Sequence, residues 1–321
     1  MRGYQVLTGL ILRRLFFGVV TLLVVSIVVF AGTEVLPGDV AEAVLGQGAT
    51  PEAVAVVRDE LNLDSPAYIR YLEWIRDLVT GNLGNSLVSR VPVSDILGPR
   101  LPNTLLLGVT AALLAVPLAV GIGLWVAMRP GSWLDRSITT GSIAFVSAPE
   151  FLVSTVLVLI FAVQLRWVPA ISRMPDGGPL SAYIAVMALP TLTLAFATFA
   201  PIMRMTRSAL LNVMAQPPIE MAILKGVPRH RIIIKHALPN ALAPIVNVIA
   251  VNLAYIIGGV VVVERIFAFP GVANLMVDGV ASRDIPVVQI CAMFFCGLYV
   301  VLNLAADIIS ILSNPRLRHP K

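Results

Sequence analysis

The sequence predicts an all-α integral membrane protein with six transmembrane helices. Hydrophobic residues make up 58% of its 321 residues and charged residues only 13%, and the mean hydropathy is +0.89. Soluble globular proteins average about 45–50% apolar and about 25% charged residues. Glycine and proline number 23 each without a collagen-like period, and there are two cysteines, so a collagen, a disordered chain and a disulfide scaffold are excluded.

Six apolar runs are long enough to span a bilayer. The hydrocarbon core is about 30 Å thick and needs about 20 apolar helical residues, because no water satisfies the backbone there. The runs are Leu15–Thr33, Leu101–Met128, Ser137–Leu165, Gly177–Met203, Asn240–Val263 and Ile285–Ala306. Only the third run contains a charged residue, Glu150. We expect each run to form one helix, and the first to be retained, because its 19 residues exceed the about 7–15 of a signal peptide.

The segment between the first two spans, residues 35–100, is polar and acidic. Pro51 and Glu52 are typical of a helix start, and we expect an amphipathic helix through Asp59. The stretch Tyr68–Trp74 has helical periodicity and aromatic residues suited to a membrane interface. These features favour a small helical scaffold packed on the bundle over direct contact with a substrate.

The charges predict an orientation. Basic residues gather in the N-terminal segment, in two of the connections and in the C-terminal tail, whereas acidic residues gather between Glu34 and Asp95. Because cytoplasmic loops carry excess lysine and arginine, we expect both termini in the cytoplasm and residues 35–100 outside. Nucleic-acid binding is a weaker interpretation, because the basic residues occupy short turns between spans.

The chain lacks the motifs of a nucleotide-hydrolysing or metal enzyme. Its three lysines are Lys225, Lys235 and Lys321, and none stands in a phosphate-binding loop. We find no dinucleotide fingerprint, zinc-protease motif or nucleophile elbow. Cys291 and Cys296 are five residues apart and therefore lie on different helix faces, which predicts apolar filling. We expect no enzyme and no resident metal, and any ATP used must be hydrolysed by a partner.

Two acids lie within or near the spans. Asp307 is close to the end of the last span and within reach of Asn314–Arg316, which favours an interfacial structural acid. Glu150 falls in the middle of an apolar run, directly after Pro149. It marks either a substrate path or a bundle-facing acid that is hydrogen-bonded to a neighbouring helix.

The loop after the fourth span predicts a short, self-contained helix. Pro217 and Pro218 start it, Lys225 lies in its last turn and Gly226 stops it. Ile219, Ala222 and Ile223 share one predicted face. A second helix is expected from Arg229 through Ile232–Ile234 to Pro239. The short helix either projects as an apolar and charged knob or lies against the bundle.

This loop resembles that of the permease subunits of ABC importers of the dipeptide and oligopeptide type. The family pattern is E-A-A, three residues, Gly, nine residues and I-x-L-P. It corresponds to Glu220–Ala222, Gly226 and His236–Pro239, with Met at its second position and His in place of Ile. His236–Leu242 is similar to the peptide branch, except for Pro239. Further matching stretches are Leu36–Asp39, Leu101–Thr104, Gly131–Asp135, Val263–Gly271, Arg283–Pro286 and Asn314–Arg316.

The resemblance covers nearly the whole chain and implies the type I ABC importer permease fold in a cell inner membrane. It implies a second, homologous permease as heterodimeric partner, two cytoplasmic ATPase subunits that bind ATP and Mg, an extracytoplasmic substrate-binding protein and surrounding membrane lipid. It implies no nucleic acid and no cofactor in this chain. The expected substrates are dipeptides and oligopeptides, and the same fold also serves importers of nickel, glutathione, opines or sugar derivatives.

The resemblance also implies functional residues. ATPase coupling falls on Glu220, Met221, Ala222, Lys225 and Gly226. Independently of the resemblance, which assigns no role to Glu150, a candidate translocation path includes Glu150, Pro190, Asn247 and Asn252. A possible outer gate or binding-protein dock includes Glu264, Phe267, Arg283 and Asp284, beside a short helix expected over Ala273–Ala281. No catalytic residue is expected.

The expected organisation has four parts: an N-terminus with the first span (1–34), the helical segment (35–100), the permease core (101–313) with its coupling loop (204–240), and the tail (314–321).

Two other classes of membrane protein remain as alternatives. An ion-coupled secondary transporter is disfavoured by the single acid within the spans and the lack of an inverted repeat. A membrane anchor without transport activity is disfavoured by six spans with prolines at Pro117 and Pro190.

Overall fold

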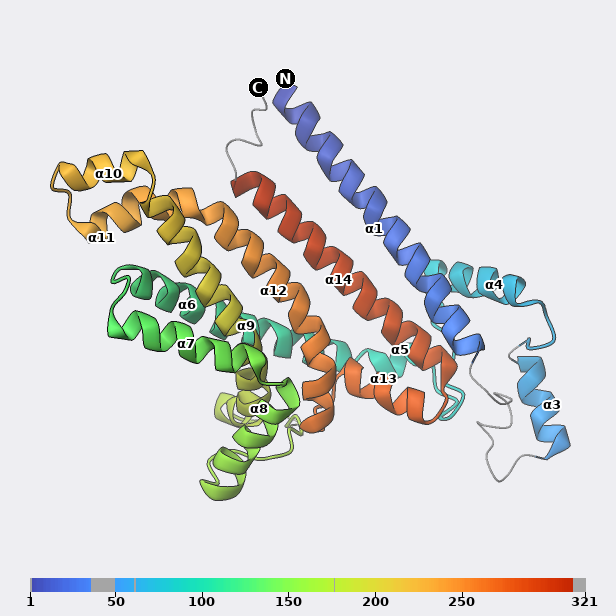
Figure 1. Ribbon diagram of the computed structural model, residues 1–321. Helices are drawn as coiled ribbons and strands as arrows, with labels where there is room; N and C mark the ends of the chain where they lie inside the picture. Colours follow the sequence, from blue (N-terminus) through green and yellow to red (C-terminus); the bar gives the residue numbers. More distant parts are fainter. Residues whose placement is uncertain (1, 36–49, 61, 176, 314–321) are drawn as a thin grey trace. The chain divides into compact units, whose positions relative to one another are not determined.

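The computed structural model describes residues 2–35, 50–60, 62–175 and 177–313. The described residues form helices and turns and contain no β-strand, only an isolated bridge between Asn85 and Pro92 (Figure 1). The expected motif Leu36–Asp39 and the tail motif Asn314–Arg316 lie outside the described residues.

The described helices follow one another along the chain in the order of their labels. Their bounds are α1 (Arg2–Glu34), α3 (Pro51–Glu60), α4 (Ala67–Thr80), α5 (Val93–Leu97), α6 (Arg100–Ala127), α7 (Trp133–Ser147), α8 (Glu150–Leu157), the π-helical η2 (Val158–Gln164), α9 (Leu180–Met214), α10 (Pro217–Leu224), α11 (Arg229–Arg231), the π-helical η3 (Ile232–Ala237), α12 (Leu238–Ile266), α13 (Val272–Ala281) and α14 (Ile285–Ser313).

Five helical stretches of the described chain are long and apolar enough to cross a membrane. They are Ile11–Glu34, Val93–Ala127, Leu180–Met214, Ile232–Ile266 and Ile285–Ile309. Each contains most or all of one expected span, so the prediction of an all-α membrane protein is confirmed. Many apolar side chains of α1 are exposed, as expected of a helix that faces lipid.

The third expected span, Ser137–Leu165, is helical but not one continuous helix. Helix α7 ends at Ser147, and α8 begins at Glu150 and continues as η2. Pro149 caps α8 with φ −61° and ψ 145°. A proline donates no backbone hydrogen bond and disfavours helical geometry in the residue before it, so the helix breaks at this point.

The loop after α9 also differs in one respect from the expectation. The second loop helix does not stop at Pro239, because α11 and η3 run directly into α12. Pro239 comes shortly after the π-helical turn η3, and the helix continues through it into α12. The fifth span therefore starts before the expected Asn240.

The segment between the first two spans has the expected helices. Helix α3 covers the predicted Pro51–Asp59 and ends at Glu60. Helix α4 contains the predicted Tyr68–Trp74 and ends at Gly81, whose φ of +83° forms a left-handed cap. Helix α13 contains the predicted short helix and begins one residue earlier, at Val272.

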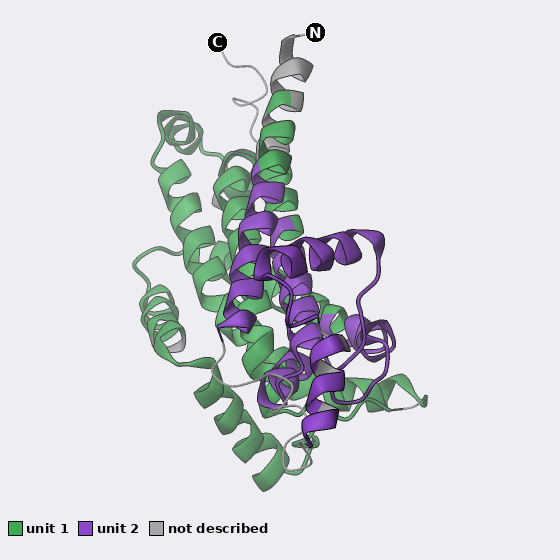
Figure 2. Cartoon of the chain, turned by 90° about the vertical axis from the view of Figure 1, so that its right-hand side faces the viewer, with its two compact units in different colours: residues 1–16, 105–269, 301–321 green, residues 17–104, 270–300 purple. Residues whose placement is uncertain are grey.

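The chain forms two compact units (Figure 2). Unit 1 comprises residues 1–16, 105–269 and 301–321, and unit 2 comprises residues 17–104 and 270–300. In unit 1, α9 and α12 pack along one another, and α7 and α8 pack against α9. The core of unit 2 is formed by Val93, Leu97, Val272, Leu275, Val287, Ile290 and Cys291. Cys291 is fully buried there, as expected of apolar filling.

Candidate functional site

Helix α10 is a short helix with a defined start and stop. It begins with Pro217 and Pro218, after Gln216 in extended geometry. At its end the Gly226 N–H donates to the Ile223 carbonyl at 2.9 Å and the Val227 N–H to the Ala222 carbonyl at 3.2 Å. This pair of bonds is a Schellman motif, which requires a left-handed residue, and Gly226 has φ +73°. The predicted stop at Gly226 is therefore present.

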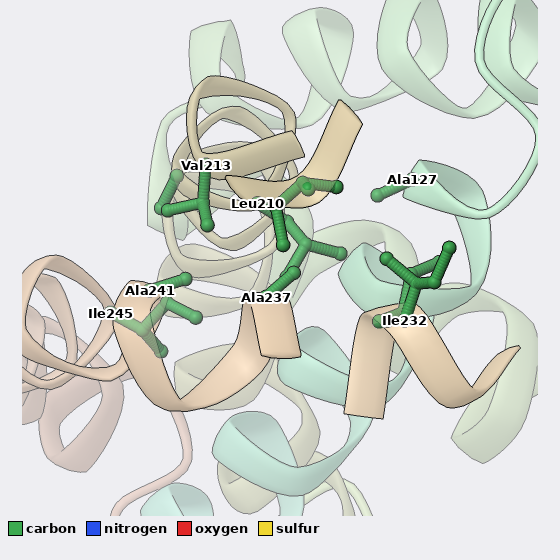
Figure 3. Close-up of a cluster of buried hydrophobic side chains, with 10 residues drawn as sticks. Ala127, Leu210, Val213, Ile232, Ala237, Ala241 and Ile245 are labelled. Atoms are coloured by element: carbon green, nitrogen blue, oxygen red, sulfur yellow. The ribbon is translucent and has the colours of Figure 1, made fainter. Parts of the chain in front are cut away.

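One side of α10 is anchored in a buried cluster of unit 1. Ile219 is 4% exposed, and Ala222 and Val227 pack beside it. The remaining members come from the ends of four other elements (Figure 3). They are Ala127, Ala209, Leu210, Val213, Ile232, Ile233, Ala237, Ala241 and Ile245. The cluster joins α10 to α9, η3 and α12, so a force on α10 reaches both long helices.

Outside this cluster, α10 carries an exposed apolar surface. Met221 is 54%, Ile223 53% and Leu224 75% exposed, and the charged Glu220 and Lys225 flank them in the exposed class. Ile219, Ala222 and Ile223 have the i, i+3, i+4 spacing of one helix face, but Ile223 is not part of the buried cluster and stays exposed. Exposed apolar residues on a helix of eight residues with charges at both ends form a surface suited to a protein partner.

A buried ion pair ties α9 to the first turn of α7. Arg207 of α9 donates from Nε and Nη2 to the two carboxylate oxygens of Asp135, at 2.6 and 2.7 Å. Asp135 also accepts from the Gly131 N–H at 2.8 Å and from Thr139 Oγ1 at 3.4 Å. Its side chain is 4% exposed and that of Arg207 22%. Such a bidentate pair fixes both partners in one geometry.

The hydrogen bonds from Arg207 dominate the ionisation of Asp135. Together with the Gly131 N–H they lower the pKa of the Asp135 carboxyl, although its burial acts in the opposite direction. Asp135 is therefore a carboxylate at neutral pH, and the ion pair is intact there.

The second acid expected near a span end, Asp307, forms an ion pair in unit 1. Its carboxylate lies 3.0 Å from Nη1 of Arg14. The pair joins α14 to α1 and agrees with a structural acid. The other expected partner, Arg316, lies outside the described residues.

Glu150 is the first residue of α8, and its carboxylate lies against α12. A Cβ added at Gly259 would come within 2.8 Å of Glu150 Oε1, so only a glycine permits this approach. The Glu150 side chain is half-buried. Among the described residues it makes no hydrogen bond or ion pair, so the expected bond to a neighbouring helix is absent from this part of the chain.

The other residues of the expected path are distributed over α9 and α12. Pro190 is buried inside α9. Asn252 of α12 is half-buried, and its Nδ2 donates to the carbonyl of Val248 in the same helix, at 2.8 Å. Asn247 is exposed. Five residues separate the two asparagines, which places them on different faces of α12, so they do not form one site with Glu150.

Glu264 and Phe267, two of the expected gate residues, are both fully buried in unit 1. The Phe267 carbonyl accepts a hydrogen bond from the Ser172 N–H at 2.8 Å, and the Glu264 carbonyl accepts one from the Phe269 N–H at 2.8 Å. These bonds fix the turn that follows α12. Neither side chain offers an exposed docking surface.

Arg283 and Asp284, the other two, belong to unit 2. Arg283 has φ +55° and is half-buried. Asp284 is 4% exposed; its carboxylate accepts from the Leu87 N–H at 3.1 Å and from Ser86 Oγ. Asp284 thus holds the loop before α5 to the start of α14.

The Asp135–Arg207 pair was not expected as a site. The local signal for it is Ser132 followed three residues later by Asp135, the pattern of a capping box. Ser132 Oγ does accept from the Asp135 N–H, at 3.2 Å. The partner in α9 is 72 residues away in the chain, and no local pattern identifies it.

Comparison with known proteins gives one consistent result. A family profile described as "Binding-protein-dependent transport system inner membrane component" matches residues 119–319, and the corresponding N-terminal profile matches residues 7–108. A probable peptide ABC transporter permease protein of Sinorhizobium fredii is 36% identical over 96% of this chain and 99% of its own length. A glutathione transport system permease protein of Salmonella choleraesuis is 34% identical, over 96% and 98%.

Proposed function

Because the chain belongs to the family of binding-protein-dependent transport system inner membrane components, we propose that it forms half of the translocation pathway of an importer for dipeptides and oligopeptides. The chain is a permease subunit of an ABC transporter and not an enzyme. The peptide substrate is supported by the name of the relative from Sinorhizobium fredii.

The observation that carries the mechanism is the exposed apolar side of α10. A cytoplasmic ATPase subunit binds this side, with Met221, Ile223 and Leu224 in a groove of the ATPase. Glu220 and Lys225 orient the helix through opposite charges at its two ends. Gly226 sets the angle at which α10 leaves the surface, because its left-handed turn fixes the chain direction.

The buried cluster under α10 transmits the movement. ATP binding draws two ATPase subunits together, and each carries its docked helix with it. Ile219 connects α10 to α9 and α12, so both long helices follow. ATP shifts the equilibrium between inward and outward states only as far as it interacts differently with them. The ATP and Mg belong to the partner subunits, because this chain has no phosphate-binding loop.

The Asp135–Arg207 pair extends the moving body to a third element. Arg207 lies on α9, one helical turn before the buried Leu210 that packs in the cluster. The pair fixes the first turn of α7 to α9, so α7 moves with α9 when α10 is displaced. Asp135 and Arg207 are positioning residues in this scheme and do not contact the substrate.

The remaining parts of the assembly follow from the proposed function. They are a second, homologous permease in a heterodimer, two ATPase subunits and an extracytoplasmic substrate-binding protein. The basic loops, including α10, lie in the cytoplasm together with both termini, and residues 35–100 lie outside. The permease core comprises residues 101–313, with the coupling loop at residues 204–240.

Glu150 is the best candidate for a residue on the path. Its carboxylate is half-buried at the break between α7 and α8, and acids within a membrane span are functional candidates. Pro190, Asn247 and Asn252 are weaker candidates. Glu264 and Phe267 of unit 1, and Arg283 and Asp284 of unit 2, stay as candidates for an outer gate or binding-protein dock.

Glutathione is the second candidate substrate, because the relative from Salmonella choleraesuis is named for it. Glutathione is itself a small peptide, so the same pathway chemistry serves both. Nickel, opine or sugar-derivative import and ion-coupled transport have no comparable support.

Uptake of a labelled dipeptide into proteoliposomes with the partner subunits tests the proposal. Uptake should require ATP on the side of the membrane that carries the ATPase subunits. An imposed proton gradient without ATP should give no uptake. Glu220→Arg and Gly226→Pro should abolish uptake, the latter because proline cannot adopt φ +73°. Glu52→Arg, an exposed first-turn acid of α3, is the matched control. Uptake driven by a proton gradient without ATP would refute the proposed class of transporter.

A further inference from the structure

Unit 2 contains a small cavity at the end of α1. Its volume is about 170 Å³, and its walls come from the last turn of α1, from α4 and from the first turn of α14. The lining residues that carry polar groups are Thr33, Glu34, Arg70, Trp74 and Gln289. Gln289 Nε2 donates to Thr33 Oγ1 at 2.8 Å, which fixes α14 to α1 at the cavity wall. Neither the proposed transport mechanism nor the family resemblance assigns a role to this cavity.

Two buried donors at the cavity have no acceptor. Arg70 Nε and Trp74 Nε1 are buried and make no hydrogen bond within the described part of the chain. The Arg70 side chain is 14% exposed, and its Nη2 already pairs with Glu34 Oε1. Buried N–H groups without partners are rare because each costs free energy. Two of them on neighbouring turns of α4 point to an acceptor beyond the described residues.

The cavity also offers an acceptor. Glu34 is 35% exposed and uses Oε1 for Arg70. Its second oxygen, Oε2, has no partner among the described residues. The site therefore presents two N–H donors and one carboxylate oxygen, and Arg70 and Glu34 together carry no net charge. A ligand that matches both features has an oxyanion and an ammonium group close together.

The surroundings favour a lipid as the source of this ligand. Phe30, Tyr71 and Trp74 form an aromatic group with ring centroids 5.5, 6.0 and 6.2 Å apart. Such groups mark the level of lipid head groups, and Glu34 ends the first span. The preceding turns of α1 expose Val24 and Ile27, each more than half exposed, so acyl chains can cover them. The cavity is also smaller than the about 300–1,000 Å³ of sites that enclose whole small molecules.

We propose that this cavity binds the head group of a zwitterionic phospholipid with a primary ammonium, of the phosphatidylethanolamine type. The phosphate oxygens accept hydrogen bonds from Arg70 Nε and Trp74 Nε1, and the ammonium donates to Glu34 Oε2. The acyl chains lie along the exposed apolar side of α1. The inference is independent of the proposed transport function.

Native mass spectrometry of the full chain in detergent tests the site with three added lipids. Phosphatidylethanolamine should bind about fivefold more tightly than phosphatidylcholine, whose quaternary ammonium has no N–H to donate, or phosphatidylglycerol, which has no cation. Trp74→Phe keeps the ring but removes the donor, and it should weaken phosphatidylethanolamine binding about fivefold. Trp133→Phe, at an indole that is 77% exposed, is the control and should change nothing.

A second variant tests the ammonium contact. Glu34→Gln should reduce the preference for phosphatidylethanolamine over phosphatidylcholine to less than about twofold. Equal binding of the three lipids, or equal effects of Trp74→Phe and Trp133→Phe, would overturn the proposal. Displacement of bound phosphatidylethanolamine by a dipeptide at this site would also overturn it, because the same polar groups would then serve the substrate and not a lipid.

Discussion

Replacing Asp135 by asparagine removes one of the two carboxylate oxygens that bind Arg207. In the wild-type chain the Asp135 carboxylate accepts hydrogen bonds from Arg207 Nε and Nη2 at 2.6 and 2.7 Å and from the Gly131 N–H at 2.8 Å. An asparagine amide can place its oxygen toward Nη2 and Gly131, but its NH2 group then faces the Nε donor. Asp135→Asn therefore loses one charge-assisted hydrogen bond and leaves a repulsive contact between two donors.

The expected cost is about 2–3 kcal/mol. Hydrogen bonds to charged groups contribute roughly 1.5–3 kcal/mol, and breaking one side of a buried ion pair costs roughly 3–5 kcal/mol. Arg207 is 22% exposed, so water partly replaces the lost oxygen and the lower part of this range applies. For a chain of 321 residues, an unfolding entropy of about 2.1 cal/mol/K per residue converts this loss into an apparent Tm lowered by roughly 3–5 °C.

Thermal unfolding in detergent, followed by intrinsic fluorescence at one scan rate, measures this shift. Asp77→Asn is the control, because Asp77 is exposed on α4, and its Tm should stay within about 1 °C of the wild type. The double variant with Arg207→Gln should be more stable than the sum of the single losses predicts, by about 1 kcal/mol or more. A Tm for Asp135→Asn equal to that of Asp77→Asn would show that the ion pair does not stabilise unit 1.

Three further changes have defined outcomes. Ile219→Ala should cost about 2–4 kcal/mol by leaving a cavity in the cluster, and Ile223→Ala, at a side chain 53% exposed, should cost less than about 0.5 kcal/mol; equal Tm shifts would refute the assigned burial. Gly226→Ala should cost about 1–2 kcal/mol through its left-handed φ alone, since nothing lies within 4 Å of the added Cβ; unchanged stability by the same assay would count against this turn. The lowered pKa of the Asp135 carboxyl adds stability that is present above its unfolded pKa of about 3.9 and is lost as the pH falls through the lower folded value. Asp135→Asn should therefore reduce the fall of Tm below about pH 4. A pH profile of Tm equal to that of the wild type would contradict this linkage.

The positions of the membrane spans could be predicted from the absence of charges. Backbone groups in lipid must be satisfied within a helix, so long apolar runs have few other structures available. The third run was misjudged because hydropathy does not register Pro149, which breaks the helix without adding a charge. Pro239 has the opposite effect: it predicts a stop, but the helix continues through it, with the π-helical turn η3 shortly before it.

The short helix α10 could be predicted because its signals are local. Proline at the start and glycine at the end fix its limits whatever the rest of the chain does. How much of its apolar face is buried depends on neighbours from α9, η3 and α12. Helical periodicity therefore places Ile223 on the face of Ile219 but does not reveal that Ile223 stays exposed. The Asp135–Arg207 and Ser86–Asp284 contacts join residues that are 72 and 198 positions apart in the chain. A single sequence does not reveal such pairs.

The docking of α10 on an ATPase subunit is tested most directly by copurification. Leu224→Asp puts a charge at a side chain that is 75% exposed, and Val79→Asp puts the same charge at one that is 81% exposed on α4. The proposed function predicts that the partner ATPase subunits copurify with the Val79→Asp chain at wild-type stoichiometry and are lost from the Leu224→Asp chain, while both variants keep the wild-type Tm. Equal retention of the ATPase subunits by the two variants would contradict it.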